Sequence, residues 1–519
     1  MSETVATARL ARDLPGFLRS PISLAEARAG VTARLEGRAR RLLTTLERVV
    51  FADPRHPYAW LLKVAGCESG DVRWFIQSEG VEDALNRLAR AGVYLTFEEL
   101  KGRQPVTRGS QTLSLRDGEL GNAVLRPHFS VFTGGSGGRP TRVPRALSMY
   151  DGAASLLALA LSAHGISRRR HVLWLNGPVD WLLMHGRLGA RVSAWFHPVA
   201  PLAPRIRLGA HLLASIGMLA GHRFPSPRHL DISDAERMVR WLRLHQIHNA
   251  TTVINATASA AVRVAGAARM AGERLAGVTF ICEAEPLTTA RRRAIESSGA
   301  RAIANYASME LNTLGYSCAA PRTSDDVHFA TDRYAVIQRE HDRDGERITS
   351  LAFTSLDATE PMICLNVELG DSAAVERRDC ACDLGELGLR THLETIRSFE
   401  KMSTAGTTFA RGDLVRIVED VLPARFGGTL LDYQITEEEA EGGEGRLVLR
   451  ASPDLGVVDE AELRRVLLSA LGQHGLVSRS HAALLGQSAA ITIRRAAPLR
   501  TSTGKLFPIR LGLRSTIDG

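Results

Sequence analysis

The sequence predicts an α/β fold: a large N-terminal α/β domain, whose first part is helical, and a small C-terminal α+β domain. Three patterns predict it. Residues up to about 126 contain mainly amphipathic helical stretches. Short apolar runs then alternate with helical stretches, as in a parallel sheet with crossover helices. After about residue 397 short helices and a hairpin pattern follow, so we place the domains at residues 1–396 and 397–519.

Helical periodicity is clear near the N-terminus. Residues 24–50 are predicted to form one long amphipathic helix, and residues 81–93 a second one. The apolar positions of the first are Leu24, Val31, Leu35, Leu42 and Leu46. The apolar run at residues 155–166 is shorter than the roughly 20 residues of a membrane span and is expected to be a buried helix. The N-terminus lacks an apolar signal core, so we expect a cytoplasmic protein without a membrane partner.

The middle of the chain carries the strand signals. The predicted strands are residues 171–177, 191–196, 251–256, 277–283 and 300–306. Between the last two, Leu287, Ala290, Ala294 and Ile295 share one helical face, and Gly299 is a suitable helix end. A strand, a helix and a strand in this order predict a parallel pair with a crossover helix.

The C-terminal part has a different character. Residues 413–423 are predicted to form a short helix, residues 432–452 a hairpin with an acidic tip, and residues 459–475 an amphipathic helix. These elements support a separate α+β domain.

The charge of the chain raises the question of nucleic-acid binding. The net charge is +9, with basic clusters at residues 167–171 and 290–294. Neither cluster is interleaved with aromatic residues, so we expect solvated faces and no specific nucleic-acid partner, although a basic nucleic-acid binder stays an alternative. Of 65 basic residues only Lys63, Lys101, Lys401 and Lys505 are lysines, so a lysine can mark chemistry that arginine does not perform.

A glycine-rich segment, SVFTGGSGGRPT at residues 130–141, follows an apolar stretch. Glycine allows close backbone approach to a ligand, and serine and threonine add hydroxyl donors, so such a loop can hold phosphate. The segment lacks the Gly-Lys-Ser/Thr of a Walker loop, and Pro140 stands where the dinucleotide pattern needs its third glycine. It is therefore a different phosphate loop or a flexible surface turn.

Several further segments follow this loop in a fixed order. They are CEAEPLTTARRRAIESSGA (282–300), NYASMEL (305–311), LNVELGD (365–371), CAC (380–382), IRSFEKM (396–402) and LRTSTGKL (499–506). With this ordered set, residues 94–505, including GVYLTFEELKGR upstream of the loop, resemble the adenylate-forming superfamily of acyl-CoA synthetases, adenylation domains and luciferases. Within it the chain is most similar to the phenylacetate–CoA ligase-like branch.

The resemblance implies a nucleotide site. The phosphate-loop positions are Thr133, Gly134, Gly135, Ser136, Gly137 and Gly138, and the adenine-lining positions are Ala284, Glu285 and Pro286. Tyr306 corresponds to the aromatic residue of the Tyr-Gly-x-Thr-Glu motif, and Asp371 to the ribose-binding aspartate. Arg397 resembles the arginine that opens the hinge between the two domains, about which the small domain would rotate between half-reactions.

The same resemblance implies two catalytic residues. Glu310 corresponds to the Mg²⁺-linked carboxylate, and Lys505 to the C-terminal lysine. A compact ammonium suits the attack of a carboxylate on the α-phosphate of ATP, because it can bridge the two anionic groups. The alternative for Lys505 is a solvated surface lysine, and for Glu310 and Asp371 a helix cap or a turn carboxylate.

The six cysteines suggest a metal site more than disulfides in a cytosolic chain. The phenylacetate branch often carries Cys-x-Cys with an upstream cysteine and histidine. Cys380 and Cys382, with Cys318 and His328, match this pattern and would complete a tetrahedral structural zinc site. The alternative is three buried cysteines and a surface histidine.

These observations predict an ATP-dependent acid–thiol ligase. The substrate would be a small carboxylic acid, the cofactors ATP, Mg²⁺ and coenzyme A, and Zn²⁺ structural. One alternative transfers the acyl group to a carrier protein or a protein cysteine. The other is a degenerate, non-catalytic adenylate-binding scaffold, suggested by Gly137, Met309 and Asn366 at positions that usually hold other residues.

Overall fold

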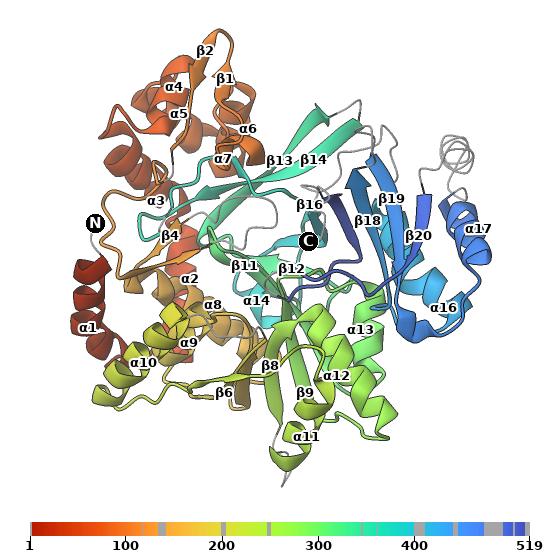
Figure 1. The fold of residues 1–519 in the computed structure, drawn as a ribbon. Helices are drawn as coiled ribbons and strands as arrows, with labels where there is room; N and C mark the ends of the chain where they lie inside the picture. Colours follow the sequence, from red (N-terminus) through yellow and green to blue (C-terminus); the bar gives the residue numbers. More distant parts are fainter. Residues whose placement is uncertain are drawn as a thin grey trace.

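The computed structural model describes residues 3–116, 118–132, 142–198, 204–245, 251–343, 346–360, 362–398, 411–439, 445–471, 491–501 and 504–513. A helical N-terminal part lies on one side of a large mixed α/β body, and a small C-terminal domain lies on the other (Figure 1). The predicted α/β fold class is confirmed. Within the described residues, no helix has the length and apolar character needed to cross a membrane.

The N-terminal part consists of short helices. They are α1 (Glu3–Arg19), α2 (Leu24–Glu36), α3 (Arg38–Thr45), the π-helical turn η1 (Leu46–Phe51), α4 (Pro57–Val64), α5 (Ser69–Glu79) and α6 (Val81–Arg90). The prediction of one helix over residues 24–50 is wrong at Gly37. Its backbone lies at φ −89° and ψ 7°, outside the helical region, and it ends α2 and precedes α3. Glycine disfavours the helix because it loses the most backbone freedom on ordering.

A large mixed sheet forms the centre of the molecule. Within the described residues its order is β16-β17-β12-β11-β10-β9-β8-β5-β6-β7. The strands are β5 (Arg170–Trp174), β6 (Val192–His197), β7 (Pro227–His229), β8 (Thr252–Thr257), β9 (Val278–Glu283), β10 (Arg301–Ser308), β11 (Asn312–Ser317), β12 (Val327–Phe329), β16 (Asp371–Arg377) and β17 (Thr391–Ser398). The run from β10 through β7 is parallel, and the five predicted strands all lie in it.

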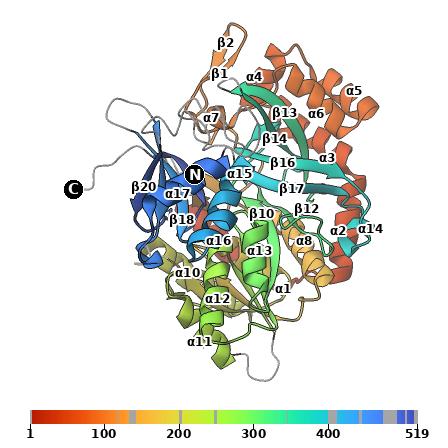
Figure 2. The same cartoon turned by 90° about the vertical axis from the view of Figure 1, so that its right-hand side faces the viewer.

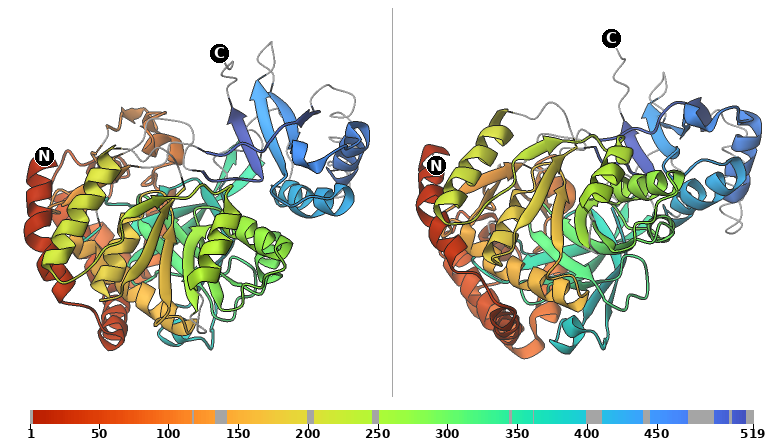
Figure 3. Two further views of the ribbon diagram at one scale, coloured as in Figure 1. Left: turned by 60° about the horizontal axis from the view of Figure 1, so that its bottom comes forward. Right: turned by 90° about the horizontal axis from the view of Figure 1, so that it is seen from below.

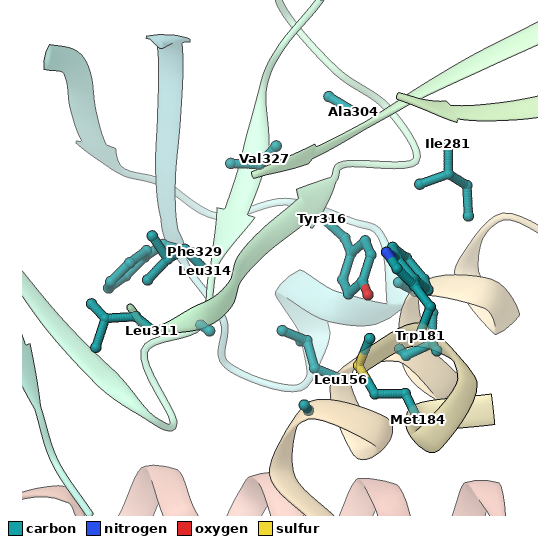
Figure 4. Close-up of a cluster of buried hydrophobic side chains, with 14 of the residues drawn as sticks. Leu156, Trp181, Met184, Ile281, Ala304, Leu311, Leu314, Tyr316, Val327 and Phe329 are labelled. Atoms are coloured by element: carbon teal, nitrogen blue, oxygen red, sulfur yellow. The ribbon is translucent and has the colours of Figure 1, made fainter. Parts of the chain in front are cut away.

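Helices connect and cover these parallel strands. They are α8 (Tyr150–Ala163), α9 (Val179–Arg187), α10 (Pro204–Leu219), α11 (Ala235–His245), α12 (Ala258–Met270) and α13 (Thr289–Glu296). The predicted crossover helix is α13, which joins the parallel strands β9 and β10. Trp181 and Met184 of α9 pack near Ile281 of β9 and Tyr316 of β11 in the buried core (Figure 4).

Smaller elements complete the large domain. A hairpin of β13 (Tyr334–Arg343) and β14 (Glu346–Ser355) pairs with the short β15 (Val367–Glu368). Two further hairpins are β1 (Val106–Arg108) with β2 (Gln111–Leu113), and β3 (Phe129–Phe132) with β4 (Arg142–Arg145). The short helices are α7 (Phe97–Leu100), η2 (Leu147–Met149) and α14 (Asp383–Glu386).

The C-terminal domain has its own hydrophobic core, with Leu414, Val418, Tyr433 and Leu467 among its members. Its elements are α15 (Arg411–Arg416), the π-helical η3 (Ile417–Val421), α16 (Leu422–Phe426), β18 (Tyr433–Glu439), β19 (Gly445–Ala451), η4 (Pro453–Leu455), α17 (Glu460–Leu471), β20 (Ile491–Arg495) and β21 (Ile509–Leu513). The predicted hairpin is the antiparallel pair β18 and β19. Figure 3 shows this domain beside the large domain. The boundary at residue 397 stays a prediction, since β17 ends at Ser398 and residues 399–410 are outside the described part.

A buried ion pair ties β13 to the loop before β15. The Arg333 guanidinium donates to Glu360 Oε1 at 2.8 Å, and the Tyr334 hydroxyl donates to Glu360 Oε2 at 2.9 Å. The two charged side chains are 3% and 1% exposed. Charges this deeply buried are stable only while they remain paired.

We therefore predict that Arg333→Met lowers the free energy of unfolding by about 3–5 kcal/mol, because it leaves the Glu360 carboxylate buried and unpaired. Urea denaturation followed by tryptophan fluorescence measures this. Arg322→Met is the control, because its pair with Glu376 is about half exposed and should contribute at most about 1 kcal/mol. Equal losses for the two variants would contradict the prediction.

Candidate active site

The candidate site lies at the carboxyl ends of β8, β9 and β10, where parallel α/β sheets bind ligands. Glu283 ends β9, and Ala284 follows it with a φ of +64°, a conformation that strains a residue with a side chain. A segment of the C-terminal domain lies over this edge, because the backbone N–H of Leu506 donates to Glu285 Oε1 at 2.7 Å. The predicted C-terminal lysine thus lies beside the strand ends of the large domain.

Lys505 is partly buried among carboxylates. Burial lowers the pKa of its ammonium group, while the negative charges of Glu285, Glu283 and Glu310 act in the opposite direction. The two residues predicted to be catalytic, Lys505 and Glu310, are therefore within electrostatic reach of each other. The alternative of a solvated lysine remote from the other predicted residues does not fit this position.

Glu310 has a second cationic neighbour. The Lys101 Nζ atom lies 2.8 Å from Glu310 Oε1, and the two side chains are 16% and 12% exposed. The sequence analysis assigned Lys101 no role. Its residue type could have pointed to a role, because lysine is rare in this chain. Two of the four lysines, Lys101 and Lys505, lie near the carboxylate of Glu310.

Glu283 is a further carboxylate that the sequence analysis did not single out. Its Oε2 atom accepts hydrogen bonds from Trp181 Nε1 and Asn305 Nδ2, each at 2.9 Å. Burial raises the pKa of Glu283, and these hydrogen bonds and the Lys505 charge partly offset the rise. These hydrogen bonds hold the Glu283 carboxyl group within electrostatic reach of the Lys505 ammonium.

The structure brings Tyr306 and Asp371 together. The Tyr306 hydroxyl donates to Asp371 Oδ2 at 2.8 Å, between β10 and the first residue of β16. Arg397 of β17 lies in register with Ser372, next to Asp371, and its guanidinium donates to Asp325 Oδ2 at 2.6 Å. Three residues predicted for nucleotide binding therefore lie along one edge of the site.

The predicted phosphate loop, Thr133 to Gly138, lies outside the described residues, but the hairpin that carries it is described. Its strands β3 and β4 pair as far as Phe132 and Arg142. The Arg145 guanidinium at the base of β4 donates to Met309 O at 2.7 Å and pairs with Asp180 at 3.1 Å. The base of the hairpin is thus fastened next to Glu310.

Ala284, Glu285 and Pro286 are predicted to line the adenine site. The carboxylate of Glu285 already accepts hydrogen bonds from other residues of the protein. Glu285 accepts hydrogen bonds from the Ser259 N–H and hydroxyl, both at 2.8 Å, and from Arg291 at 2.8 Å. Its side chain is completely buried. The carboxylate is therefore used within the protein, and the backbone of this segment and the side chains of Ala284 and Pro286 remain for a ligand.

Asn366, at one of the unusual positions, has a structural environment. It is fully buried with a φ of +52°, and its Nδ2 atom donates to the carbonyls of Leu85 and Val93 at 2.9 and 3.0 Å. The side chain joins the segment before β15 to the N-terminal helices. This role accounts for an asparagine at this position without reference to a ligand.

A second cluster fits a metal ion. The donor atoms of Cys318, His328, Cys380 and Cys382 all lie within 4.8 Å of one another. The Cys318 and Cys382 sulfurs are 3.9 Å apart, near the roughly 3.8 Å expected for a tetrahedral site with Zn–S bonds of about 2.3 Å. His328 is fully buried, so the alternative of a surface histidine is wrong.

The surroundings of this cluster also suit zinc. His328 Nδ1 lies 2.6 Å from the Leu389 carbonyl, and Nε2 lies 3.0 Å from Cys382 Sγ. A hydrogen bond from one ring nitrogen to a carbonyl commonly orients the other nitrogen of a metal-binding histidine toward the metal. Hydrogen bonds from Cys318 and His328 lower the pKa of the Cys382 thiol, whereas the hydrogen bonds of Cys318 to the other two sulfurs and its burial raise the pKa of Cys318. A set of three thiolates and one imidazole is typical of structural zinc.

No protein-family model matches the chain, and no curated protein matches it. Among solved structures, 2-hydroxyisobutyryl-CoA ligase in the postadenylation state, in complex with 2-HIB-AMP, has a TM-score of 0.53 at 15% identity. The match covers 95% of this chain and 91% of that one. This chain has the fold of the adenylate-forming enzymes.

An open conformation of the same ligase, in complex with 2-HIB-AMP and CoA, gives a TM-score of 0.48 at 14% identity, covering 91% of this chain and 92% of that one. An anthranilate CoA ligase in complex with anthranoyl-AMP gives 0.45 at 12% identity, covering 78% and 68%.

The metal cluster leads to a prediction that does not depend on activity. The purified protein should contain one zinc per chain, and Cys382→Ser should lose it and unfold at a lower temperature, because structural zinc contributes to folding. Plasma emission spectrometry and thermal unfolding measure the two effects. Cys67→Ser, at a half-buried cysteine outside the cluster, is the control and should keep the metal. Full zinc content in Cys382→Ser would contradict this site.

Proposed function

We propose that this protein is an AMP-forming acid–thiol ligase. A carboxylate attacks the α-phosphate of ATP to give an acyl-adenylate and pyrophosphate, and a thiol then accepts the acyl group. The observation that carries the proposal is the position of Lys505, which the C-terminal domain places over the strand ends beside Glu283, Glu285 and Glu310. The adenylate-forming fold supports it.

Lys505 would act on charge in the first half-reaction. The attacking carboxylate and the α-phosphate are both anionic, so their approach is unfavourable without a cation between them. An ammonium at the site of attack stabilises the oxygens on which charge collects in the transition state. Glu283, held by Trp181 and Asn305, keeps an opposite charge near this ammonium.

The other predicted residues would bind the nucleotide. Asp371, with Tyr306 behind it, would accept hydrogen bonds from the ribose hydroxyls, and Arg397 lies next to it. The loop at residues 133–138 would hold the β- and γ-phosphates. Glu310 would hold Mg²⁺, which would neutralise phosphate charge when bound. Lys101 pairs with Glu310 and would compete with Mg²⁺ for this carboxylate.

We propose coenzyme A as the acceptor thiol and a small carboxylic acid, aryl acids first, as the substrate. The support is the similarity of the ordered motifs to the phenylacetate–CoA ligase-like branch, together with the CoA ligase whose fold the chain shares. Product formation that requires a carrier protein, with pyrophosphate release independent of CoA, would instead favour transfer to a carrier.

Lys505→Ala should reduce carboxylate-dependent ATP–pyrophosphate exchange by about 10²–10³-fold, the usual effect of removing one preorganised charge-stabilising group. The assay covers a panel of aryl, short-chain and fatty acids. Lys63→Ala, at an exposed lysine of the N-terminal helices, is the control and should exchange normally. Undiminished exchange in Lys505→Ala would contradict the role of Lys505, and absence of exchange in the native protein would favour the scaffold alternative.

Lys101→Met should lower the Mg²⁺ concentration needed for half-maximal exchange, because the ammonium no longer competes for Glu310. A partly exposed ion pair of about 1 kcal/mol corresponds to a shift of about fivefold. Titration of Mg²⁺ at saturating ATP measures it, and Lys63→Met is the matched control. An unchanged or higher Mg²⁺ requirement would show that Lys101 does not compete with the metal.

A further inference from the structure

A cluster of buried charges joins the two domains. Arg291 of α13 is 0% exposed and pairs with Glu285 of the large domain and Glu419 of η3 in the C-terminal domain, each at 2.8 Å. The side chains of both glutamates are at most 1% exposed. In Figure 2 α13 lies beside α15 and α16, which flank η3. We call Arg291, Glu285 and Glu419 the interdomain ion cluster.

This cluster corrects one expectation from the sequence. The basic run at residues 290–294 was expected to be a solvated face, but only part of it is. Arg293 is exposed, whereas Arg291 is completely buried because the C-terminal domain covers it. Burial alone would lower the pKa of Arg291, but the carboxylates of Glu419 and Glu285 raise it. The guanidinium is therefore charged and fully paired.

The ion cluster holds the backbone of the residue that follows Lys505. Glu285 Oε1 accepts from the Leu506 N–H at 2.7 Å, and Arg291 donates to the Leu506 carbonyl at 3.0 Å. Both polar backbone atoms of Leu506 are thus bound to the cluster. The ammonium of Lys505 cannot move far from the strand ends while these bonds last.

Glu419 is the member of the cluster that joins the C-terminal domain to the large domain. Glu419 contacts the large domain through both oxygens, one with Arg291 and the other with the Thr288 hydroxyl. Loss of the Glu419 carboxylate while the domains stay docked would leave the buried Arg291 guanidinium with one carboxylate partner instead of two, which is unfavourable. Glu419 lies in a π-helical segment, an irregularity that often marks functional positions. A buried ionic contact that exists only while the domains are docked is suited to a two-state domain arrangement.

We propose that Arg291, Glu285 and Glu419 are positioning residues that dock the C-terminal domain with Lys505 at the site of acyl-adenylate formation. This inference rests on the proposed function and deepens it. The cluster stabilises only the arrangement in which Lys505 is in place. It therefore supports the first half-reaction and contributes nothing to thiol transfer from an acyl-adenylate that is already formed.

The test compares Glu419→Ala and Glu419→Gln with the native enzyme. Within the described residues, the hydrogen bonds and ion pairs of the Glu419 side chain are all with the large domain, so neither substitution removes such a bond from the described part of the C-terminal domain. Glutamine keeps the shape and can still accept from Thr288, so it should have the smaller effect. Glu462→Ala is the control, because Glu462 pairs with Arg425 and Arg465 inside the same domain.

Two half-reactions are measured for each variant. Glu419→Ala should reduce ATP–pyrophosphate exchange at least tenfold with a smaller loss for Glu419→Gln, whereas single-turnover transfer from added acyl-adenylate to CoA should be unchanged or faster. Glu462→Ala should match the native enzyme in both. Equal losses in the two half-reactions, or no loss in either, would overturn the proposal.

A third measurement separates this inference from the proposed function. Hydrogen–deuterium exchange of the peptide that contains the Leu506 amide needs no substrate. Glu419→Ala should speed exchange of this amide at least tenfold, and Glu462→Ala should leave it unchanged. Unchanged protection in Glu419→Ala would refute the docking role even in an active enzyme. Faster exchange in a chain without any ligase activity would retain the docking role and refute the proposed function.

Discussion

The position of Lys505 depends on one fully buried ion pair, between Arg291 and Glu285. Glu285 directly follows Ala284, whose strained backbone turns the chain at the end of β9 and directs the carboxylate toward the C-terminal domain. Ser259 and Leu506 satisfy the remaining acceptor positions of this carboxylate. Buried charges are stable only while their hydrogen bonds and ion pairs are kept. The Leu506 backbone, which is bound to Glu285 and Arg291, therefore holds the neighbouring Lys505 within a narrow range of positions.

Hydrophobic periodicity was sufficient to predict which segments form helices and strands, but not where each of them begins and ends. The strands β8, β9 and β10 and the helix α13 follow from apolar spacing, because that spacing states which side faces the core. The helix predicted over residues 24–50 is interrupted at Gly37. Glycine is less favourable in a helix than alanine by about 1 kcal/mol, and this small difference is hard to weigh from the sequence. Arg291 was misjudged because its burial is caused by Glu419, 128 residues away.

The residues of the candidate site that could be predicted are those that the ordered motifs assign a role. They indicated Lys505, Glu310, Tyr306 and Asp371, and the structure places these residues around one edge of the sheet. Lys101 and Glu283 lie within two of these segments, but the motifs assign neither residue a role. Lys101 contacts Glu310, which is 209 residues away, and Glu283 contacts Trp181, which is 102 residues away. The spacing of residues within a short segment carries no information about contacts over such separations.

The balance of charge explains why cations would have to enter this site together with the ligand. Glu283, Glu310 and Asp371 make its surface acidic, and a polyphosphate approaching them alone would be repelled. Lys101 pairs with Glu310, and the ammonium of Lys505 belongs to a segment of the C-terminal domain that is bound at the strand ends. On our proposal, a nucleotide that brings its own divalent cation can displace Lys101 from Glu310, whereas a free anion cannot. The acidic site would then reject phosphate compounds without a metal ion and accept ATP as its magnesium complex.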